Sequence, residues 1–287
     1  MIVTRLIKLA ISGLLRSIDY LKKVILLLVG VPPPGRCVVL YYHAITRGQR
    51  DRFARQMDNL LELATPISAE IPPFVAKGVH YAAVTFDDAF ISIIENAIPE
   101  LVQRKIAFTV FVPTGYLGRC PEWMRGREEV VMSEEQLKRL GHIPIASIGS
   151  HCVTHSDLLS LDAEEAKNEI IQSKRDLENI VKRRIGTISF PHGTFDQKHI
   201  ELAKQAGYER VFSILPRFAF SHPDEYVTGR VRVDTTDWVL EFRLKLLGAY
   251  RWLPLAFFLK HKIRLMISKF TGLKRQLSLT RGPLQNG

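Results

Sequence analysis

Short apolar segments alternate with amphipathic helical patterns along most of this chain, and no other feature constrains its fold more. The apolar runs, rich in β-branched and aromatic residues, predict strands at 37–42, 82–87, 107–112, 145–150, 187–190, 211–214 and 231–233. Helical patterns lie between them at 51–63, 91–104, 133–140, 162–181 and 196–206. Ser133 with Gln136 and Asp162 with Glu165 have the spacing of capping boxes. Repeated strand–helix units predict a parallel sheet with helices outside it, and 287 residues suffice for one large α/β barrel.

Two adjacent carboxylates, Asp87 and Asp88, stand at the C-terminal end of the predicted strand 82–87. Adjacent acids are costly to bury unless they share a metal or a proton. Successive strand residues point to opposite sides, so the two acids can take separate roles, one on a metal and one on a water. A solvated turn after the strand is an equal alternative for this pair taken alone.

A second polar cluster contains His151 and His155, which follow the apolar run 145–148. On a helical turn, histidines four residues apart share one face, and this spacing suits a single metal ion. Cys152 would point away from that face, so packing is favoured over a role as a thiolate ligand. Combined with the Asp pair, the two histidines predict a site with one carboxylate, two imidazoles and open positions for water and substrate.

A third segment, Thr187–Gly193 (TISFPHG), closes another strand with a Pro-X-Gly turn. The order TFDD, HxxxH and FPxG resembles that of the polysaccharide deacetylases of carbohydrate esterase family 4, the NodB homology family. The segments 38–43 and 230–233 are similar to the poly-N-acetylglucosamine deacetylase branch, in which the motif order is circularly permuted. The resemblance covers roughly residues 37–240. It implies a distorted, incomplete (β/α)7 barrel with active residues at the C-terminal ends of its strands.

The resemblance also implies a metal-dependent N-deacetylase, which removes acetyl from an N-acetylated sugar in a polysaccharide or a lipid-linked glycan. Asp88, His151 and His155 would hold a divalent metal, with Zn²⁺ as the default for a mixed set of imidazole and carboxylate ligands. Asp87 would be the general base toward a water that the metal activates.

Two further histidines have implied catalytic roles. His43 would be the general acid that protonates the leaving amine. His192 follows Pro191, in the slot usually held by tyrosine, and would offer its backbone N–H to the tetrahedral oxyanion. Each has an alternative: His43, next to two tyrosines, also fits a hydrogen-bonded core histidine, and His192 also fits a substrate contact or a metal ligand.

The sequence departs from the family pattern in the first and third motifs. Ala89 replaces the glycine that usually ends the first motif, and a methyl group is compatible with that turn if φ stays negative. Ser189 occupies the slot of an arginine that orients the base, and Arg230, from a later strand, is the candidate substitute. Asp234 and Asp237 fit two interpretations equally, a late motif of unpermuted members and a turn that caps the next helix.

Three other functions stay open as alternatives. One is a hydrolase of another small N-acyl group. A second is a non-haem iron oxygenase built on two histidines and a carboxylate, although the motif order and the extra Asp87 argue against it. A third is a catalytically silent glycan-binding or assembly protein that keeps the fold. The three cysteines are odd in number and widely spaced, so they predict no disulfide framework.

The net charge of +11 is concentrated at the two ends of the chain. Residues 240–287 contain ten Lys or Arg and one acidic residue, and residues 1–36 contain six and one. The middle of the chain is therefore mildly acidic. This pattern predicts a basic N-terminal helix and Pro-rich linker at 1–36, a catalytic domain at 37–239 and a basic amphipathic segment at 240–287.

The N-terminal segment predicts an amphipathic helix of about thirty residues with a basic polar face. Its apolar stripe consists of Ile7, Ile11, Leu14, Ile18, Leu21, Ile25 and Leu28. The longest apolar run, 24–31, is too short to span a bilayer, and no cleavage site of a signal peptide follows it. A helix lying in a membrane interface is favoured. A coiled-coil seam, or a helix packed on the flank of the barrel, stays open.

The C-terminal segment 240–270 interleaves aromatic and basic residues, with Pro254 expected to kink or divide it. Such a composition suits an anionic lipid surface better than nucleic acid, which we do not expect as a partner. We therefore expect a peripheral protein on the cytoplasmic side of the inner membrane, with an N-acetylated glycan as substrate. The oligomeric state is left open by the sequence.

Overall fold

The structure is a computed structural model that describes residues 2–70, 75–124 and 129–259. The chain divides into two compact units, Met1–Arg251 and Trp252–Gly287. In the second unit, a short helical segment begins at 253 and continues to the end of the described range at 259. Most of the expected C-terminal segment, from 260 onward, lies outside the described residues. The domain boundaries expected at 36/37 and 239/240 stay predictions.

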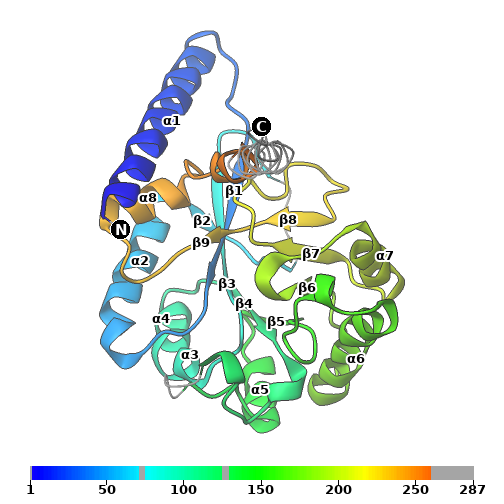
Figure 1. Ribbon diagram of the computed structural model, residues 1–287. Helices are drawn as coiled ribbons and strands as arrows, with labels where there is room; N and C mark the ends of the chain where they lie inside the picture. The colour runs from blue at the N-terminus through cyan, green and yellow to red at the C-terminus, as the bar shows by residue number, and fades with distance from the viewer. Residues whose placement is uncertain (1, 71–74, 125–128, 260–287) are drawn as a thin grey trace, which may run out of the picture. The chain divides into compact units, whose positions relative to one another are not determined.

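A sheet of parallel strands forms the centre of the first unit (Figure 1). Its strands follow the order β8-β7-β6-β5-β4-β3-β1-β9, and β2 also pairs with β3. The bounds are β1 Arg36–Tyr42, β2 Thr65–Pro66, β3 His80–Phe86, β4 Phe108–Val112, β5 Ala146–Ser150, β6 Thr187–Ser189, β7 Arg210–Ser213, β8 Val227–Gly229 and β9 Val231–Arg232. Every predicted strand is therefore present within a few residues of its expected bounds.

The two ends of the sheet meet at Arg230. β8 pairs with β7 at one end of the strand order, and β9 pairs with β1 at the other. Because Arg230 alone separates β8 from β9, residues 227–232 act as one strand that joins both edges. With β1, β3, β4, β5, β6 and β7, this closing strand makes a nearly closed barrel of seven strands. The expected (β/α)7 barrel is confirmed.

Helices follow most of the strands and cover the outside of the barrel (Figure 1). Ser133 and Asp162 cap α5 and α6, each with the predicted capping box. The expected helix 91–104 is divided in two at Ala97, because Pro99 lacks the N–H that a continuous helix needs there. The α-helical bounds are α1 Ile2–Leu28, α2 Arg50–Leu63, α3 Ile91–Asn96, α4 Ile98–Gln103, α5 Glu134–Gly141, α6 Ala163–Val181, α7 Gln197–Gln205 and α8 Val239–Leu246. The 3-10 helices are η1 Arg47–Gln49, η2 Thr114–Tyr116, η3 Glu122–Met124, η4 Leu158–Ser160 and η5 Pro191–Gly193.

Alternate residues of each strand belong to two different buried layers. On β1, Val38 and Leu40 pack in the large cluster that includes the apolar sides of the helices. Cys37 and Val39 instead join a smaller cluster with Ala83 of β3 and with phenylalanines of β4 and β7, which fills the barrel interior. Side chains of a strand alternate between its two faces. Tyr41 at the end of β1 and Asp87 just after β3 are therefore on the same inward face as Cys37, Val39 and Ala83. The strand pattern thus places two polar side chains at the mouth of the barrel.

The long helix α1 runs beside α8 (Figure 1). The residues that α1 buries are the polar Ser12 and Asp19, whereas its apolar stripe is exposed. Of the alternatives that the sequence left open for this helix, packing against the same unit therefore occurs, but through the polar face. Within the described residues, no helix combines the length and the apolar character needed to cross a membrane.

Candidate active site

A cavity of about 690 Å³ opens at the C-terminal ends of the strands. Side chains from all three sequence motifs and from the end of β1 line it. The lining residues with titratable side chains are Tyr41, Tyr42, His43, Asp87, Asp88, Glu129, His151, His155, His192, Arg232 and Asp234, and Trp123 also lines the cavity. A parallel barrel brings these strand ends to one edge, and this edge holds the active site in barrels of this kind.

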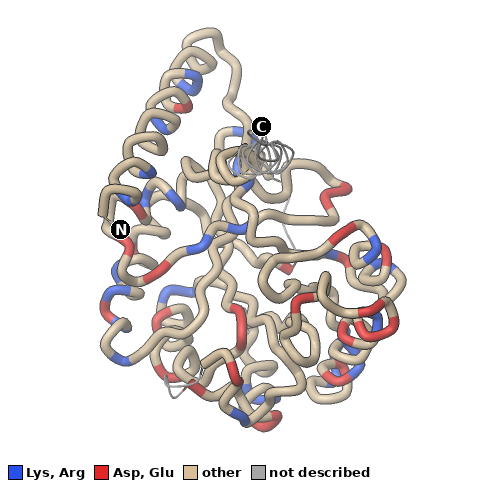
Figure 2. Tube along the Cα trace, in the orientation of Figure 1, with Lys and Arg blue, Asp and Glu red and all other residues tan. Residues whose placement is uncertain are grey.

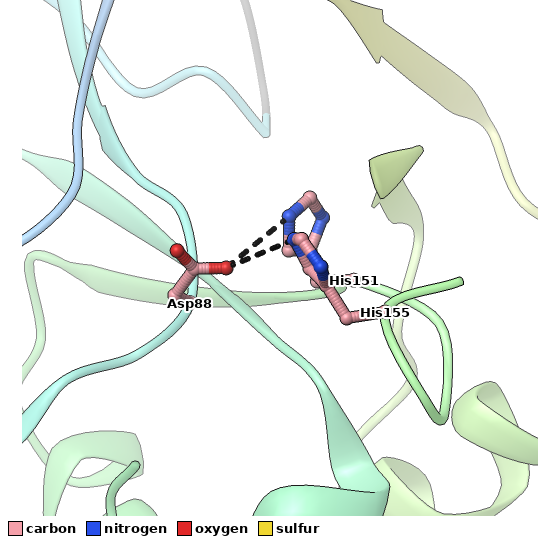
Figure 3. A group of neighbouring side chains, drawn as sticks. All are labelled: Asp88, His151 and His155. Carbon is pink, nitrogen blue, oxygen red and sulfur yellow. Dashed lines mark ion pairs between the residues drawn. The ribbon is translucent and has the colours of Figure 1, made fainter. Parts of the chain in front are cut away.

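Asp88, His151 and His155 form one cluster inside this cavity (Figure 3). Asp88 Oδ1 lies 3.6 Å from His151 Nε2 and 3.2 Å from His155 Nε2. The candidate ligand atoms of the three side chains lie within 4.8 Å of one another. Within the described ranges, this is the group of His, Cys, Asp and Glu side chains that has the geometry to hold a metal ion.

The hydrogen bonds and charges of the cluster favour a bound cation. His151 Nδ1–H donates to the Ser189 carbonyl at 2.6 Å, which leaves the lone pair of Nε2 directed at Asp88. Burial lowers the pKa of His151 to about 4, so the imidazole is neutral near pH 7. Burial raises the pKa of Asp88, but the neighbouring His155 and His151 lower it to a net value below the ordinary one. Asp88 Oδ1 is buried yet accepts no hydrogen bond of ordinary geometry, so a divalent ion fits this set of donors.

The two histidines do not lie on a helical turn, contrary to the expectation from their spacing. Residues 151–155 form a loop after β5, with Cys152 and His155 at positive φ. The loop is held on one side by His151 N–H, which donates to the Val112 carbonyl at 2.9 Å. Cys152 is fully buried, so its predicted packing role holds, although the helical reason for it was wrong.

Glu169 of α6 holds the other side of this loop. Its Oε2 accepts the backbone N–H groups of Val153 at 2.8 Å and Thr154 at 2.9 Å, and its Oε1 accepts the Thr154 hydroxyl at 2.7 Å. The carboxylate is buried and therefore replaces the hydrogen bonds that a helical turn would have supplied. The sequence signal was an acidic residue on the buried face of α6, between Ala166 and Ser173.

We expect Glu169→Gln to weaken metal binding by about 10- to 100-fold, the usual scale for partners that orient ligands. The amide keeps one acceptor oxygen, so its N–H₂ group faces either the two backbone donors or the Thr154 hydroxyl, which in the wild type donates to Oε1. Titration of the metal-free protein with Zn²⁺, followed by calorimetry, measures this. Glu164→Gln on the exposed side of the same helix is the control and should leave affinity unchanged. Equal affinities for both variants would show that the loop holds its shape without Glu169.

Asp87 is paired with the buried guanidinium of Arg230. Arg230 Nη1 and Nη2 donate to the two oxygens of Asp87 at 2.7 and 2.8 Å. Arg230 also donates to the hydroxyls of Thr85 and Ser189, at 3.1 and 2.7 Å. Its guanidinium carbon lies 4.6 Å from the ring centroid of Tyr41. Arg230 thus lies where the sequence analysis placed a substitute for the missing arginine, and Ser189 accepts from it.

The charge of Arg230 fixes the ionisation of Asp87. Burial alone raises the pKa of Asp87, but the Arg230 guanidinium and His151 lower it, and the net value is about 2. Asp87 is therefore ionised and held in one orientation at neutral pH. Its side chain separates from that of Asp88 because the backbone turns after β3: Asp88 already has φ of 69°, outside the strand region. The sequence predicted that the two acids point in different directions, but it attributed this to the pleat of the strand. The strand ends before Asp88, so the turn of the backbone is the cause instead.

Several site residues have positive φ, a strained conformation for residues other than glycine. They are Asp88 (69°), Ala89 (50°), Cys152 (63°), His155 (58°) and His192 (58°). Ala89 contradicts the expectation of a negative φ. Its backbone is held there because the Ala89 carbonyl accepts the Met132 N–H at 2.9 Å. Each such residue costs about 1–3 kcal/mol, and strain of this kind clusters at functional sites.

His43, His192 and Trp123 complete the cavity around the cluster. His43 lies at the end of β1, with its ring edge against Tyr41 at 5.7 Å between centroids. His192 is in the turn η5. In this turn the Gly193 N–H donates to the Phe190 carbonyl, whereas the His192 N–H has no partner inside the turn. Trp123, which the sequence analysis missed, stacks on His155 at 4.0 Å.

Asp234 and Asp237 stabilise a turn at the edge of the cavity. Asp234 Oδ1 accepts the N–H and the hydroxyl of Thr236, and Asp237 Oδ2 accepts the Asp234 N–H. Asp237 also pairs with Lys245 at 2.6 Å. The helix α8 then begins after Trp238, whose side chain makes no cap. Of the two interpretations, the structure favours the turn.

Comparison with known proteins agrees with this architecture. Residues 75–211 match the polysaccharide deacetylase family. YxkH of Bacillus subtilis (strain 168), whose name describes it as a polysaccharide deacetylase, is 26% identical over 211 residues. These residues cover 70% of this chain and 72% of YxkH. The poly-beta-1,6-N-acetyl-D-glucosamine N-deacetylase of Staphylococcus aureus (strain MSSA476) is 24% identical over 160 residues, which cover 52% of this chain and about half (53%) of that enzyme.

Two solved structures share the fold. IcaB from Ammonifex degensii superimposes with a TM-score of 0.61 at 22% identity and covers 76% of this chain and 98% of its own. The polysaccharide deacetylase BC0361 from Bacillus cereus also has a TM-score of 0.61, at 25% identity, over 74% of this chain and 69% of its own. With its barrel, its motifs at the strand ends and the match over residues 75–211, this chain is similar to the polysaccharide deacetylases.

Proposed function

We propose that this protein is a metal-dependent N-deacetylase of an N-acetylated sugar in a polysaccharide or a lipid-linked glycan. The observation that carries the proposal is the buried Asp88 Oδ1, which faces two imidazole nitrogens beside the ionised Asp87. The family match and the named activity of the S. aureus relative support the same reaction. A volume of about 690 Å³ lies within the usual range for small-molecule and sugar pockets.

Asp88, His151 and His155 would hold the ion, and Zn²⁺ suits one carboxylate with two imidazoles best. When bound, such an ion lowers the pKa of water and polarises the amide carbonyl. Asp87 takes up the proton from the attacking water. Arg230 holds both Asp87 oxygens, but each carboxylate oxygen has a second lone pair, so a proton can still be accepted.

Two groups across the cavity complete the reaction. The N–H of His192 donates to the oxygen that becomes negative as the amide carbon turns tetrahedral. His43 supplies a proton to the departing nitrogen, so that the sugar leaves as an amine rather than as an amide anion. Water adds to the acetyl carbon and the C–N bond breaks. The products are acetate and a free amino sugar.

His43→Ala tests the second of these roles. We expect turnover to fall by about 10²-fold, because an amine is a poor leaving group without a proton donor. Metal content should stay at the wild-type level, since His43 is not part of the ligand group. Steady-state release of acetate, measured with elemental analysis of the same preparation, gives both values. Near-normal turnover would return His43 to the role of a core histidine and leave His192 as the better donor.

Acetate release from N-acetylglucosamine oligosaccharides tests the function as a whole. Purified protein reconstituted with Zn²⁺ should release acetate and form free amines in equal amounts, as seen by mass spectrometry. A chelator should abolish both. Binding of the oligosaccharide without any release would favour the silent glycan-binding alternative. Release of acyl groups only from substrates that are not sugars would favour a hydrolase of another N-acyl group.

A further inference from the structure

The apolar stripe of α1 is exposed along its whole length. Its seven side chains are each between 36% and 81% exposed. Other long helices of the first unit do the opposite: α2, for example, buries Phe53, Met57 and Leu60. Soluble proteins seldom leave so long an apolar face uncovered unless a partner covers it.

Charge pairs on the polar face fix this orientation. Asp19 is 4% exposed and accepts hydrogen bonds from Arg36 at 3.1 Å and from Arg251 at 2.8 Å. Arg5 donates to Glu241 at 2.6 Å and lies 4.3 Å over the ring of Trp238. A rotation of α1 that buried the stripe would break these pairs, so that Arg36 would lose Asp19 and Glu241 would keep Lys245 alone. The outward direction of the stripe is therefore built into the packing of the polar face.

The N-terminal end of α1 lies at the rim of the active-site cavity. Arg5 Nη2 donates to the Thr236 carbonyl at 2.8 Å. The two preceding residues, Asp234 and Thr235, line the cavity. Two positions after Thr236, residues 238–240 are a tryptophan, a valine and a leucine that are 44–65% exposed. Exposed apolar surface from two elements thus occurs close to the entrance for substrate.

We propose that the apolar stripe of α1, together with Trp238–Leu240, docks on a lipid bilayer with anionic head groups and holds the cavity rim beside it. An amphipathic helix of this length lies in the interface with its apolar face among the acyl chains. Tryptophan is enriched at that depth.

The charge of α1 favours lipid over a second copy of the chain. Lys22 and Lys23 are exposed near the C-terminal half of the stripe, and basic residues recur along α1 in Figure 2. The one acidic residue of α1, Asp19, is already paired with two arginines. Two stripes facing each other would bring these like charges together, whereas anionic head groups would neutralise them. If the proposed function holds, the substrate is a glycan presented at the membrane surface.

Co-sedimentation of the full-length protein with phosphatidylcholine–phosphatidylglycerol vesicles tests this surface. The double variant Leu14→Glu with Ile18→Glu should reduce the partition coefficient by about tenfold or more, because two apolar side chains no longer enter the lipid. Leu61→Glu with Leu159→Glu, at exposed apolar positions elsewhere on the unit, is the matched control and should sediment like the wild type. Wild-type protein that ignores the vesicles, or a stripe variant that sediments equally well, would overturn the proposal.

Two further readouts separate the remaining outcomes. Sedimentation velocity without lipid should show no self-association that depends on the stripe; a dimer that Leu14→Glu with Ile18→Glu dissociates would assign the surface to a second copy instead. Acetate release from a soluble oligosaccharide should be the same for stripe variants and wild type. The protein could bind vesicles through the stripe and yet release no acetate. That result would support the docking surface and contradict only the proposed function.

Discussion

Asp87→Asn is expected to lower turnover by about 10²–10⁴-fold while leaving the metal content of the purified protein unchanged. Asp87 is bound through both oxygens to Arg230, and its carboxylate is not part of the ligand group. The amide keeps an acceptor for the guanidinium but cannot take a proton from water. Elemental analysis and acetate release on the same preparation measure the two quantities.

The neighbouring residue should behave in the opposite manner. Asp88→Asn removes the charge of the oxygen that faces both imidazoles, so metal and activity should be lost together. Asp58→Asn, at an exposed carboxylate on α2, is the control and should change neither quantity. If Asp87→Asn and Asp88→Asn lose metal to the same extent, both acids bind the ion and the division of roles between them is wrong.

The positions of the motifs could be predicted from the sequence because strand ends are marked locally. Short apolar runs located each strand to within a few residues, and the polar residues that follow a strand in a parallel barrel must gather at one edge. Asp87, Asp88, His151 and His192 were placed in this way. The fold class followed from the alternation of these runs with helical patterns, and the count of strands favoured the seven-stranded barrel that the resemblance implies over a regular eight-stranded one.

Local conformation inside the site could not be read in the same way. The four-residue spacing of His151 and His155 indicates a helical turn only if the backbone N–H groups find helical partners. Here Glu169, distant in sequence, accepts those of Val153 and Thr154. Ala89 similarly takes a positive φ because Met132 fixes its carbonyl. Tertiary hydrogen bonds overrode the local preference in both loops.

Closure of the barrel explains why the most distant parts of the site are the hardest to predict. The family match ends at residue 211, so His43 and Arg230 lie outside it, on opposite sides. They reach the cavity only because the segment 227–232 pairs with β7 on one side and β1 on the other. Arg230 could be nominated by its strand, but its two bonds to Asp87 depend on that closure. A hydrophobic pattern contains no such information.

Arg230→Met is expected to destabilise the protein by about 3–5 kcal/mol at pH 7, the usual cost of leaving a buried charge without its partner. The guanidinium is fully buried, and besides Asp87 it binds Thr85 and Ser189. Methionine fills a similar volume among the rings of Tyr41 and Phe111, so packing loss is a small part of the effect. Urea unfolding of the metal-free protein measures the difference.

The pH dependence of this difference identifies its cause. In the wild type the pKa of Asp87 is lowered to about 2, below the value of about 3.9 for an unfolded aspartate. This carboxylate therefore contributes stability that is present above pH 3.9 and lost as pH falls through 2. In Arg230→Met, burial is the dominant remaining influence on the pKa of Asp87, and it raises this pKa. Protonation of Asp87 therefore stabilises the folded variant relative to its unfolded chain. The free-energy gap between the two proteins should be largest at neutral pH and shrink as pH falls toward about 3.9, because Asp87 of the folded variant takes up a proton there. It should shrink further between about pH 3.9 and 2, where the wild type loses the contribution of its own Asp87.

Two variants separate the charge pair from general damage to the barrel. Arg230→Lys keeps a cation but offers one ammonium in place of a fork with two parallel bonds, so an intermediate loss of stability is expected. Arg232→Met, two residues further along the same segment and exposed, should change stability by no more than about 0.5 kcal/mol. A loss for Arg230→Met that stays constant from pH 7 to pH 3 would contradict the electrostatic cause, because a packing defect has no protons to titrate. A loss that shrinks with acid would show that Arg230 is the group that keeps Asp87 ionised in the barrel.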